Sequence, residues 1–483
     1  MRSHFTTTCA LALLWALQGC TVGPDYHRPA VAGNDKADWL TPAANTSPVD
    51  LTPWRSLGDA ALTELIEAAV EHNPDLLVAQ ANLRAARAER DAAAGHKLPE
   101  LDASASATRQ QLSENGELPV SQIPHFSRRF SLFDAGFDAS WEIDLWGGTR
   151  RTVEEAERRM DAAEAREHDA LLEVVAEVVR TYADLRGAQA GLTAVREEAQ
   201  AENDIAGLVH QRFSVGDASN LDDVRAATQA HNTAAAVGSF DAAVHSAVNQ
   251  LAVLTGRPPE ALADLAVSEA SMPMPPASVA VGLRSDVLRR RPDVRAAEID
   301  LAAATSDVGV QTANLFPTVS LIGSVGQDSE HTGNFLQGAS TQYSIGPSLH
   351  WPVFAGGSIR ARIRAADARA DAAGASYEKA VLNALADSET AINRYAAAQN
   401  TLQEREAARA QTAQALRLVQ ERYQAGDDDR SSLLEAQAAY DAAVQVWTDA
   451  GQEALEDYAA LVKALGGGWG TAEMRSSSRS SGL

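Results

Sequence analysis

The sequence contains only two cysteines, Cys9 and Cys20, so no disulfide framework can stabilise the fold. It also contains no run of eighteen apolar residues, which argues against a membrane-spanning helix. Any insertion into a bilayer would therefore depend on strands or on lipid. Basic residues are in the minority, and the formal net charge of −24 excludes a nucleic-acid-binding surface, because phosphate binding needs clustered Lys and Arg.

Motifs for catalysis are also missing. The sequence has no His-Glu-x-x-His, no Gly-x-Ser-x-Gly, no phosphate-binding glycine loop and no Cys/His pair at metal-ligand spacing. Aromatic residues make up 5% of the chain, and alanine is abundant, which is typical of close-packed helices. These features predict a protein that is not an enzyme and that needs neither a metal nor another cofactor.

Two long segments without proline stand out among the features that are present. They cover residues 149–213 and 358–424, a glycine pair precedes each, and a hydroxyl residue, Thr149 or Ser358, begins each. Each segment is predicted to be one continuous helix of roughly 100 Å, at 1.5 Å per residue. The hydroxyl residue is the expected N-cap, because its oxygen can accept from an N–H group of the first turn.

The chain is internally duplicated, since Asn73-Pro74-Asp75 matches Arg291-Pro292-Asp293 and Gly216 matches Gly426. The predicted domains are a signal peptide (1–19), an acylated N-terminus and belt (20–60), repeat 1 (61–257), a linker (258–285), repeat 2 (286–466) and a disordered tail (467–483). Each repeat is predicted to contain a leading helix, a β-hairpin (about 100–146 and 318–353), a long helix and a return helix (219–256 and 431–465).

The return and leading helices of each repeat are expected to stack end to end, because together they are nearly as long as the continuous helix. Asn73 and Pro74 suit the N-cap and first helical position of the first leading helix. Arg291 is a poor N-cap in the second copy.

The hairpins are predicted from a two-residue periodicity. From Ser131 to Glu142, and more briefly in 343–351, apolar residues alternate with polar ones as in half-buried strands. Trp141, Trp146 and Trp351 lie at the hairpin ends that lead into the long helices, a position typical of aromatic residues at a membrane interface. A soluble hairpin with core aromatics is the alternative. Four strands cannot close a transmembrane barrel, so a membrane location predicts a barrel shared among subunits.

The N-terminus has the features of an exported lipoprotein. An apolar run follows Arg2, and Leu17-Gln18-Gly19-Cys20 resembles the bacterial lipobox, whose cysteine becomes the acylated first residue. Thr21 differs from the aspartate of inner-membrane retention signals, which indicates the outer membrane. An ordinary signal peptide with a chance cysteine is the alternative.

Three separated motifs, Cys20–Pro29, Leu288–Glu298 and Lys463–Trp469, resemble one family in the same order. They are similar to TolC-like outer membrane factors, in the lipoprotein (NodT-type) branch that serves tripartite RND-type efflux systems. The resemblance implies a mainly α protomer with a membrane β part, three copies of which share a 12-stranded β-barrel and a long periplasmic α-helical barrel. The implied function is an exit channel for drugs or other small toxic compounds from a Gram-negative cell. The implied partners are a homotrimer, a periplasmic adaptor (membrane fusion protein), an inner-membrane RND-type transporter and outer-membrane lipid.

The functional residues are expected at the two turns between long and return helices. If three protomers converge there, carboxylates form acidic rings that close only with cationic partners. The predicted gate carboxylates are Asp222, Asp223, Asp427, Asp428, Asp429 and Glu435. The predicted salt-bridge partners are Arg212, Arg225, Arg422 and Arg430, and the predicted adaptor-docking residues are Val215, Gly216, Ala425 and Gly426. Glu435 precedes Ala-Gln, as the family's acidic constriction residue does. The alternative role of these aspartates is to cap helix N-termini.

Two other protein classes stay open on the sequence alone. A periplasmic adaptor also has a long helical hairpin, but it would carry one hairpin flanked by compact β domains. A channel-less structural lipoprotein would not bring carboxylates together at the turns.

Overall fold

The computed structural model describes residues 21–29, 39–40, 47, 53–113, 127–268, 270–428 and 430–467, without the side chains of 430 and 431. The chain divides into two units. The sheet unit comprises Met1–Pro29, Leu83–Ala162 and Ala297–Tyr377, and the hairpin unit comprises Ala30–Asn82, Ala163–Ala296 and Glu378–Leu483. Four helices have residues in both units, namely α3 (Pro74–Gly95), α4 (Gly148–Ser214), α8 (Pro292–Ala313) and α9 (Ser358–Ala425).

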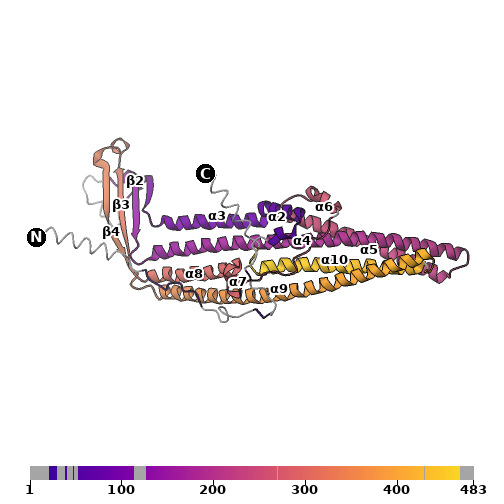
Figure 1. Cartoon of the computed structure of the whole chain (residues 1–483). Coiled ribbons are helices and arrows are strands. Elements are labelled where there is room, and N and C mark those ends of the chain that lie inside the picture. The colour runs from indigo at the N-terminus through magenta and orange to yellow at the C-terminus, as the bar shows by residue number, and fades with distance from the viewer. Residues whose placement is uncertain are drawn as a thin grey trace. The chain divides into compact units, whose positions relative to one another are not determined.

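The element order shows the internal duplication (Figure 1). Repeat 1 contains α3, β1 (Glu100–Gln111), β2 (Arg129–Ile143), α4 and α5 (Asn220–Leu254). Repeat 2 contains α8, β3 (Thr318–Ser329), β4 (Thr341–His350), α9 and α10 (Arg430–Ala464) in the same order. The elements outside this pattern are η1 (Pro53–Leu57), α2 (Ala60–His72), η3 (Pro259–Leu262), α6 (Ala263–Val267), α7 (Arg284–Arg290), η4 (Thr332–Asn334) and η5 (Gly338–Ser340). None of the helices in the described residues is long and apolar enough to cross a membrane.

The two hairpins form one antiparallel sheet in the order β1-β2-β3-β4, so that β2 and β3 join the repeats. The register places Phe137 opposite Val325, and Val325 opposite Tyr343. These three side chains are 53%, 51% and 80% exposed, and Ile345 and Leu349 on β4 are also largely exposed. In the described part of the chain, the outer strands β1 and β4 each pair on one side only. The sheet therefore presents apolar side chains and two open edges.

The predicted N-caps of the long helices are wrong. The backbone carbonyl of Gly147 accepts the first helical hydrogen bond of α4, and that of Gly357 does so for α9. Thr149 and Ser358 consequently lie inside the helices. In α4 the capping oxygen comes from the end of strand β2, where the carboxylate of Asp144 accepts from a backbone N–H of the first helical turn at 2.9 Å.

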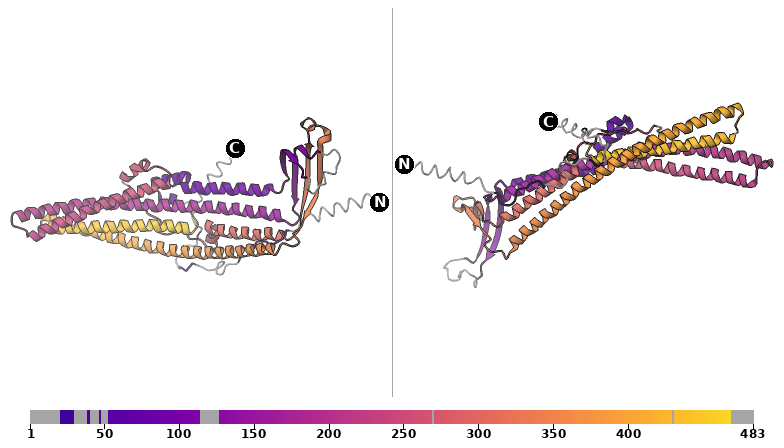
Figure 2. Two further views of the ribbon diagram at one scale, coloured as in Figure 1. Left: turned by 180° about the vertical axis from the view of Figure 1, so that it is seen from behind. Right: turned by 60° about the horizontal axis from the view of Figure 1, so that its bottom comes forward.

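The main hydrophobic core lies in the hairpin unit, where α4 and α5 form one antiparallel hairpin and α9 and α10 form another (Figure 2). Leu185, Leu251 and Leu455 have no exposed surface. Tyr182 is equally buried, and its hydroxyl donates to the carboxylate of Asp59 at 2.7 Å. Asp59 is the residue that caps α2. The start of α2 is thus bound to the same core as the long helices.

The first helix–helix junction of the hairpin unit joins the end of α5 to the start of α3. The side-chain oxygen of Asn73 accepts from two N–H groups of the first turn of α3, at 2.9 and 3.1 Å, so the predicted N-cap is confirmed. The side-chain amide of Asn73 also donates to the carbonyl of Leu254 at 2.9 Å. One side chain therefore caps one helix and binds the last residue of the other.

Candidate functional site

Both predicted gate turns have the same backbone. Gly216 and Gly426 have positive φ angles of 83° and 81°, which glycine adopts without strain. The N–H of the following aspartate, Asp217 or Asp427, donates to a carbonyl in the last turn of the preceding long helix, at 2.8 and 2.9 Å. This is the Schellman arrangement, which ends a helix while satisfying its last carbonyls.

Asp222 closes a capping box at the start of α5. Its carboxylate accepts from the backbone N–H of Ser219 at 3.3 Å and from the Ser219 hydroxyl at 2.7 Å, while its own N–H donates to that hydroxyl oxygen at 3.2 Å. These hydrogen bonds from Ser219 lower the pKa of Asp222. Asp222 thus performs the helix-capping role that was the alternative to a gate.

Ion pairs hold each turn. They join Arg212 Nε to Asp217 Oδ2 at 3.5 Å and Arg422 Nε to Asp428 Oδ2 at 3.3 Å, and His210 Nδ1 lies within hydrogen-bond distance of Asp223 Oδ1, at 3.2 Å. The Asp223 and Asp428 side chains are only 20% and 19% exposed, whereas both carboxylate and arginine of the Arg212 pair are about two-thirds exposed. Sequence reasoning missed His210, because its partner lies on the other helix of the hairpin.

The other predicted gate residues are more exposed than Asp223 and Asp428. Asp427, Arg225 and Glu435 are all exposed, and no ion pair within the described part of the chain involves them. Asp429 lies outside the described residues, as does the side chain of Arg430.

Apolar side chains face solvent at the same turns. Val215 is 78% exposed, and Leu221 and Val224 at the start of α5 are 56% and 54% exposed. At the second turn Ala425 is exposed, and Tyr423 is 41% exposed. Exposed apolar groups next to charged ones are typical of a protein-docking surface.

The three predicted interface tryptophans share one structural role in the sheet unit. Their indole N–H groups donate to backbone carbonyls, Trp141 to Lys97 at 3.0 Å, Trp146 to Pro317 at 2.8 Å and Trp351 to Leu315 at 3.1 Å. All three carbonyls lie in the connections from a leading helix to its strand. The tryptophans therefore brace the helix–strand connections of both repeats.

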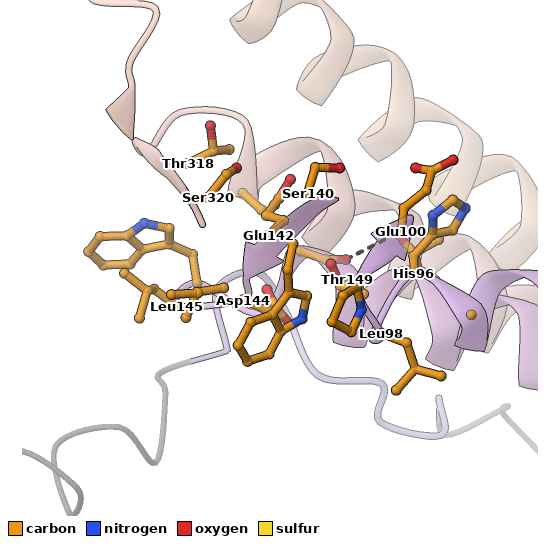
Figure 3. Close-up of a pocket in the computed structure, with 18 of the residues that line it drawn as sticks. His96, Leu98, Glu100, Ser140, Glu142, Asp144, Leu145, Thr149, Thr318 and Ser320 are labelled. Atoms are coloured by element: carbon orange, nitrogen blue, oxygen red, sulfur yellow. Dashed lines mark hydrogen bonds between the residues drawn. The ribbon is translucent and has the colours of Figure 1, made fainter. Parts of the chain in front are cut away.

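These connections border an open cavity of about 660 Å³ (Figure 3). Its polar lining includes Glu100, Glu142 and Asp144 together with hydroxyl residues of the strands and α4. Asp144 is already engaged, because it binds the guanidinium of Arg150 at 3.2 Å.

The N-terminal segment 21–29 packs on the sheet unit. The N–H of Val22 donates to the carbonyl of Trp146 at 3.1 Å. The side chain of Arg151 is only 5% exposed and pairs with Asp25 at 2.5 Å. Cys20 lies outside the described residues, but the chain that follows it is held beside the connection between β2 and α4.

A family model described as outer membrane efflux protein matches residues 65–257 and 283–467. This chain belongs to the outer membrane efflux protein family. The two matched ranges follow the two structural repeats. Nodulation protein T of Rhizobium leguminosarum bv. trifolii is 30% identical, covering 97% of this chain and 98% of that protein. Outer membrane protein OprJ of Pseudomonas aeruginosa is also 30% identical, over 97% of both. The structure of the outer-membrane channel OprN has a TM-score of 0.80 and 35% identity, covering 93% of this chain and all of that one.

Membership of the outer membrane efflux protein family confirms the resemblance seen in the motifs and the duplicated helix–hairpin–helix fold that it implied. The periplasmic-adaptor alternative is wrong, because both repeats match the efflux protein model.

Proposed function

We propose that this chain forms the outer-membrane exit channel of a tripartite efflux pump, through which drugs or other small toxic compounds leave a Gram-negative cell. One observation carries the proposal: a chain of this family presents a four-stranded sheet with exposed apolar side chains and two open edges. In lipid each unpaired backbone group of an edge costs several kcal/mol, so the edges of neighbouring copies must pair. Three copies supply twelve strands, enough to enclose a channel.

The proposed gate is the set of carboxylates at the two turns, on the periplasmic side. The pairs Arg212–Asp217 and Arg422–Asp428 neutralise part of the charge within each turn. Exposed Glu435 is left to face other protomers, and like charges that approach one another there oppose closure. Flow through the duct is passive, so the energy comes from the inner-membrane partner.

The proposed partners are a periplasmic adaptor and an inner-membrane transporter of RND type. The adaptor docks at Val215 and Gly216 in the first turn and at Ala425 and Gly426 in the second. Support comes from the exposure of Val215 and from its apolar neighbours on α5.

The proposed membrane anchor is an acylated Cys20, in addition to the strands. Support comes from the position of Val22, whose backbone binds the carbonyl of Trp146 at the end of the β2 connection. Acyl chains at residue 20 are then close to the interface that the tryptophans would occupy. More than one chain is needed for stable anchoring, which lipoprotein acylation provides.

The gate is tested by single-channel recording of the purified protein in planar bilayers. The double variant Glu435→Ala/Asp428→Ala is expected to conduct several-fold more than the wild type, because it breaks the ion pair between Arg422 and Asp428 that holds the second turn and leaves a smaller side chain in place of Glu435. Glu404→Ala is the matched control, since Glu404 is an exposed carboxylate within α9 and away from the turn. Equal conductance in all three proteins would place the constriction elsewhere. A wild type and variants that never conduct would favour the channel-less structural lipoprotein.

A further inference from the structure

The two helix–helix junctions of the hairpin unit are equivalent in place but different in chemistry. Asn73 and Arg291 both stand directly before the Pro-Asp pair that begins a leading helix. Both side chains donate to the carbonyl of the last residue of a return helix, Asn73 to Leu254 at 2.9 Å and Arg291 to Ala464 at 3.1 Å. Asn73 and Arg291 thus make the same contact with the end of a return helix, although the two side chains differ in size and charge.

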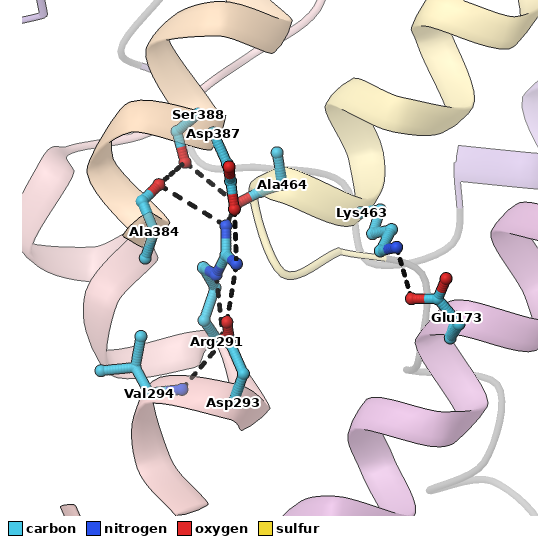
Figure 4. A network of polar contacts seen from close by, with 9 residues as sticks. All are labelled: Glu173, Arg291, Asp293, Val294, Ala384, Asp387, Ser388, Lys463 and Ala464. Atoms are coloured by element: carbon cyan, nitrogen blue, oxygen red, sulfur yellow. Dashed lines mark hydrogen bonds and ion pairs between the residues drawn. The ribbon is translucent and has the colours of Figure 1, made fainter. Parts of the chain in front are cut away.

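Arg291 binds three helices at once (Figure 4). It makes a bidentate pair with Asp293 of α8, at 3.0 and 2.7 Å, besides its bond to Ala464 of α10. On α9 it reaches the carboxylate of Asp387 at 3.4 Å and the carbonyl of Ala384 at 3.5 Å. A planar guanidinium with five N–H groups can satisfy all of these acceptors, whereas no other side chain can.

A serine of α9 reinforces this contact. The hydroxyl of Ser388 is fully buried and has two carbonyl acceptors within reach, that of Ala384 in its own helix at 2.8 Å and that of Ala464 at 3.0 Å, so α9 and α10 meet directly at the same point. Arg291 itself is 9% exposed. Burial alone would lower the pKa of Arg291, but the hydrogen bonds and charges of Asp293 and Asp387 raise it above its ordinary value. Arg291 is therefore a permanent cation, well placed beside the C-terminus of α10.

Repeat 1 lacks the corresponding tie to its long helix. With the repeats aligned on their turn glycines, Glu177 and Val178 of α4 stand at the positions of Asp387 and Ser388. Glu177 binds an arginine of its own helix at 2.5 Å and accepts from Gln250 of α5 at 2.9 Å, without contact to the junction residue, and the side chain of valine offers no hydrogen bond. Within the described residues, the hydrogen bonds of the Asn73 side chain reach α3 and α5 only. In the part of the chain that the structure describes, a junction side chain that binds three helices is thus found at the second junction alone.

We propose that Arg291 is a positioning residue for the gate: together with the core residues that follow Ser388 on α9, it fixes α9 to α8 and α10 at the junction, so that only the part of the α9–α10 hairpin beyond Tyr395 moves when the channel opens. The inference rests on the proposed gate at the turns. Just beyond Ser388, Ile392 and Tyr395 of α9 still pack in the core. From Tyr395 to Ala425 the remaining arm of α9 measures roughly 45 Å at 1.5 Å per residue. A small loosening at Arg291 therefore becomes a large displacement at the second turn, where Asp428 and Glu435 lie.

The test replaces Arg291 by the residue that stands at the first junction. Arg291→Asn keeps a donor for Ala464, adds a side-chain N-cap for α8 like that of Asn73, and removes the pair with Asp293 and the bonds to α9. Spin labels placed at Ala425→Cys, or in a parallel sample at Val215→Cys, report distances between protomers at the two turns by pulsed electron resonance. In Arg291→Asn the Ala425 distances are expected to broaden while the Val215 distances stay as in the wild type, and conductance in planar bilayers is expected to rise several-fold. Arg291→Lys, which keeps the cation and one bond, should lie between the two.

Several outcomes would overturn the proposal. One is an Arg291→Asn protein that assembles normally and has wild-type distances at Ala425 and wild-type conductance. Another is equal broadening at both turns, which would show a general loosening. If Arg291→Asn does not accumulate, the double variant Asp387→Asn/Ser388→Ala provides the test, since it leaves Arg291 and α8 intact. Unchanged Ala425 distances in this variant would overturn the proposal, and broadened distances would support it. A wild type that does not conduct contradicts the proposed channel, and the distances at Ala425 still test the role of Arg291.

Discussion

At the residue scale, two glycines allow the return and leading helices to meet. Gly256 and Gly466 end α5 and α10 with φ angles of 64° and 65°. A Cβ atom on Gly256 would lie 2.3 Å from the carbonyl oxygen of His72, and one on Gly466 would lie 3.2 Å from the backbone of Arg291. Each junction therefore depends both on the backbone conformation and on the missing side chain.

Gly256→Ala is expected to lower the free energy of unfolding by on the order of 1–3 kcal/mol, because it adds strain at positive φ and a clash with a backbone atom. Gly238→Ala is the matched control: Gly238 lies inside the same helix, and a Cβ there would meet no atom within 4 Å. It should leave stability unchanged or raise it by up to ~1 kcal/mol. Denaturant unfolding of the purified protein measures both. Equal stability of the two variants would contradict the close approach at the junction.

The roles of single residues could be predicted from the sequence where their partners are near them in the chain. The N-cap at Asn73 followed from the sequence because its partners are the next residues of the chain. The role of Arg291 did not, because its partners come from three helices that the sequence does not place together. His210 was missed for the same reason, since it meets Asp223 only once α4 and α5 fold back on each other.

At the scale of the element, helices and strands are joined by braced connections. The alternating residues 131–142 lie within β2, and the proline-free segments lie within α4 and α9, because periodicity and proline content are properties of one segment alone. The helix start at Thr149 was misplaced because the capping oxygen belongs to Asp144, in the connection that precedes the helix. The contacts of Trp146 also depend on residues far away in the sequence: it binds Pro317 in repeat 2 and stacks on Phe316 with ring centroids 4.7 Å apart.

Trp146→Phe should keep the stacking on Phe316 and lose the hydrogen bond to the Pro317 carbonyl. The expected loss of stability is about 1 kcal/mol, measured as a lower midpoint of thermal unfolding. Phe354→Leu is the control, because Phe354 is 91% exposed in the chain and has no comparable bond. A Trp146→Phe protein with the wild-type midpoint would show that the tryptophan does not brace this connection.

At the scale of the whole molecule, the sequence and the family agree on one duplicated protomer whose sheet is incomplete by itself. The shared barrel was predicted because four strands cannot close a barrel and an open sheet edge is costly in lipid. The sheet of the chain indeed has four strands, with β1 and β4 at its edges. The register between neighbouring copies depends on contacts outside a single chain. The lipid anchor at Cys20 and the assembly with an adaptor and a pump are proposals for the same reason.

The most direct test of a barrel shared by three copies is disulfide cross-linking between the edge strands. One cysteine replaces Ala105 on β1, and a second is placed in turn at Tyr343, Ile345 or Pro347 on β4, in protein oxidised in outer membranes. Because β2 and β3 separate β1 from β4 within a chain, a bond between them must join two copies. A barrel shared by three copies predicts that at least one pair gives covalent species of up to three chains on a denaturing gel, while each single variant gives at most dimers. Folded, membrane-inserted protein that stays monomeric for every pair, or a ladder that continues beyond three chains, would contradict it.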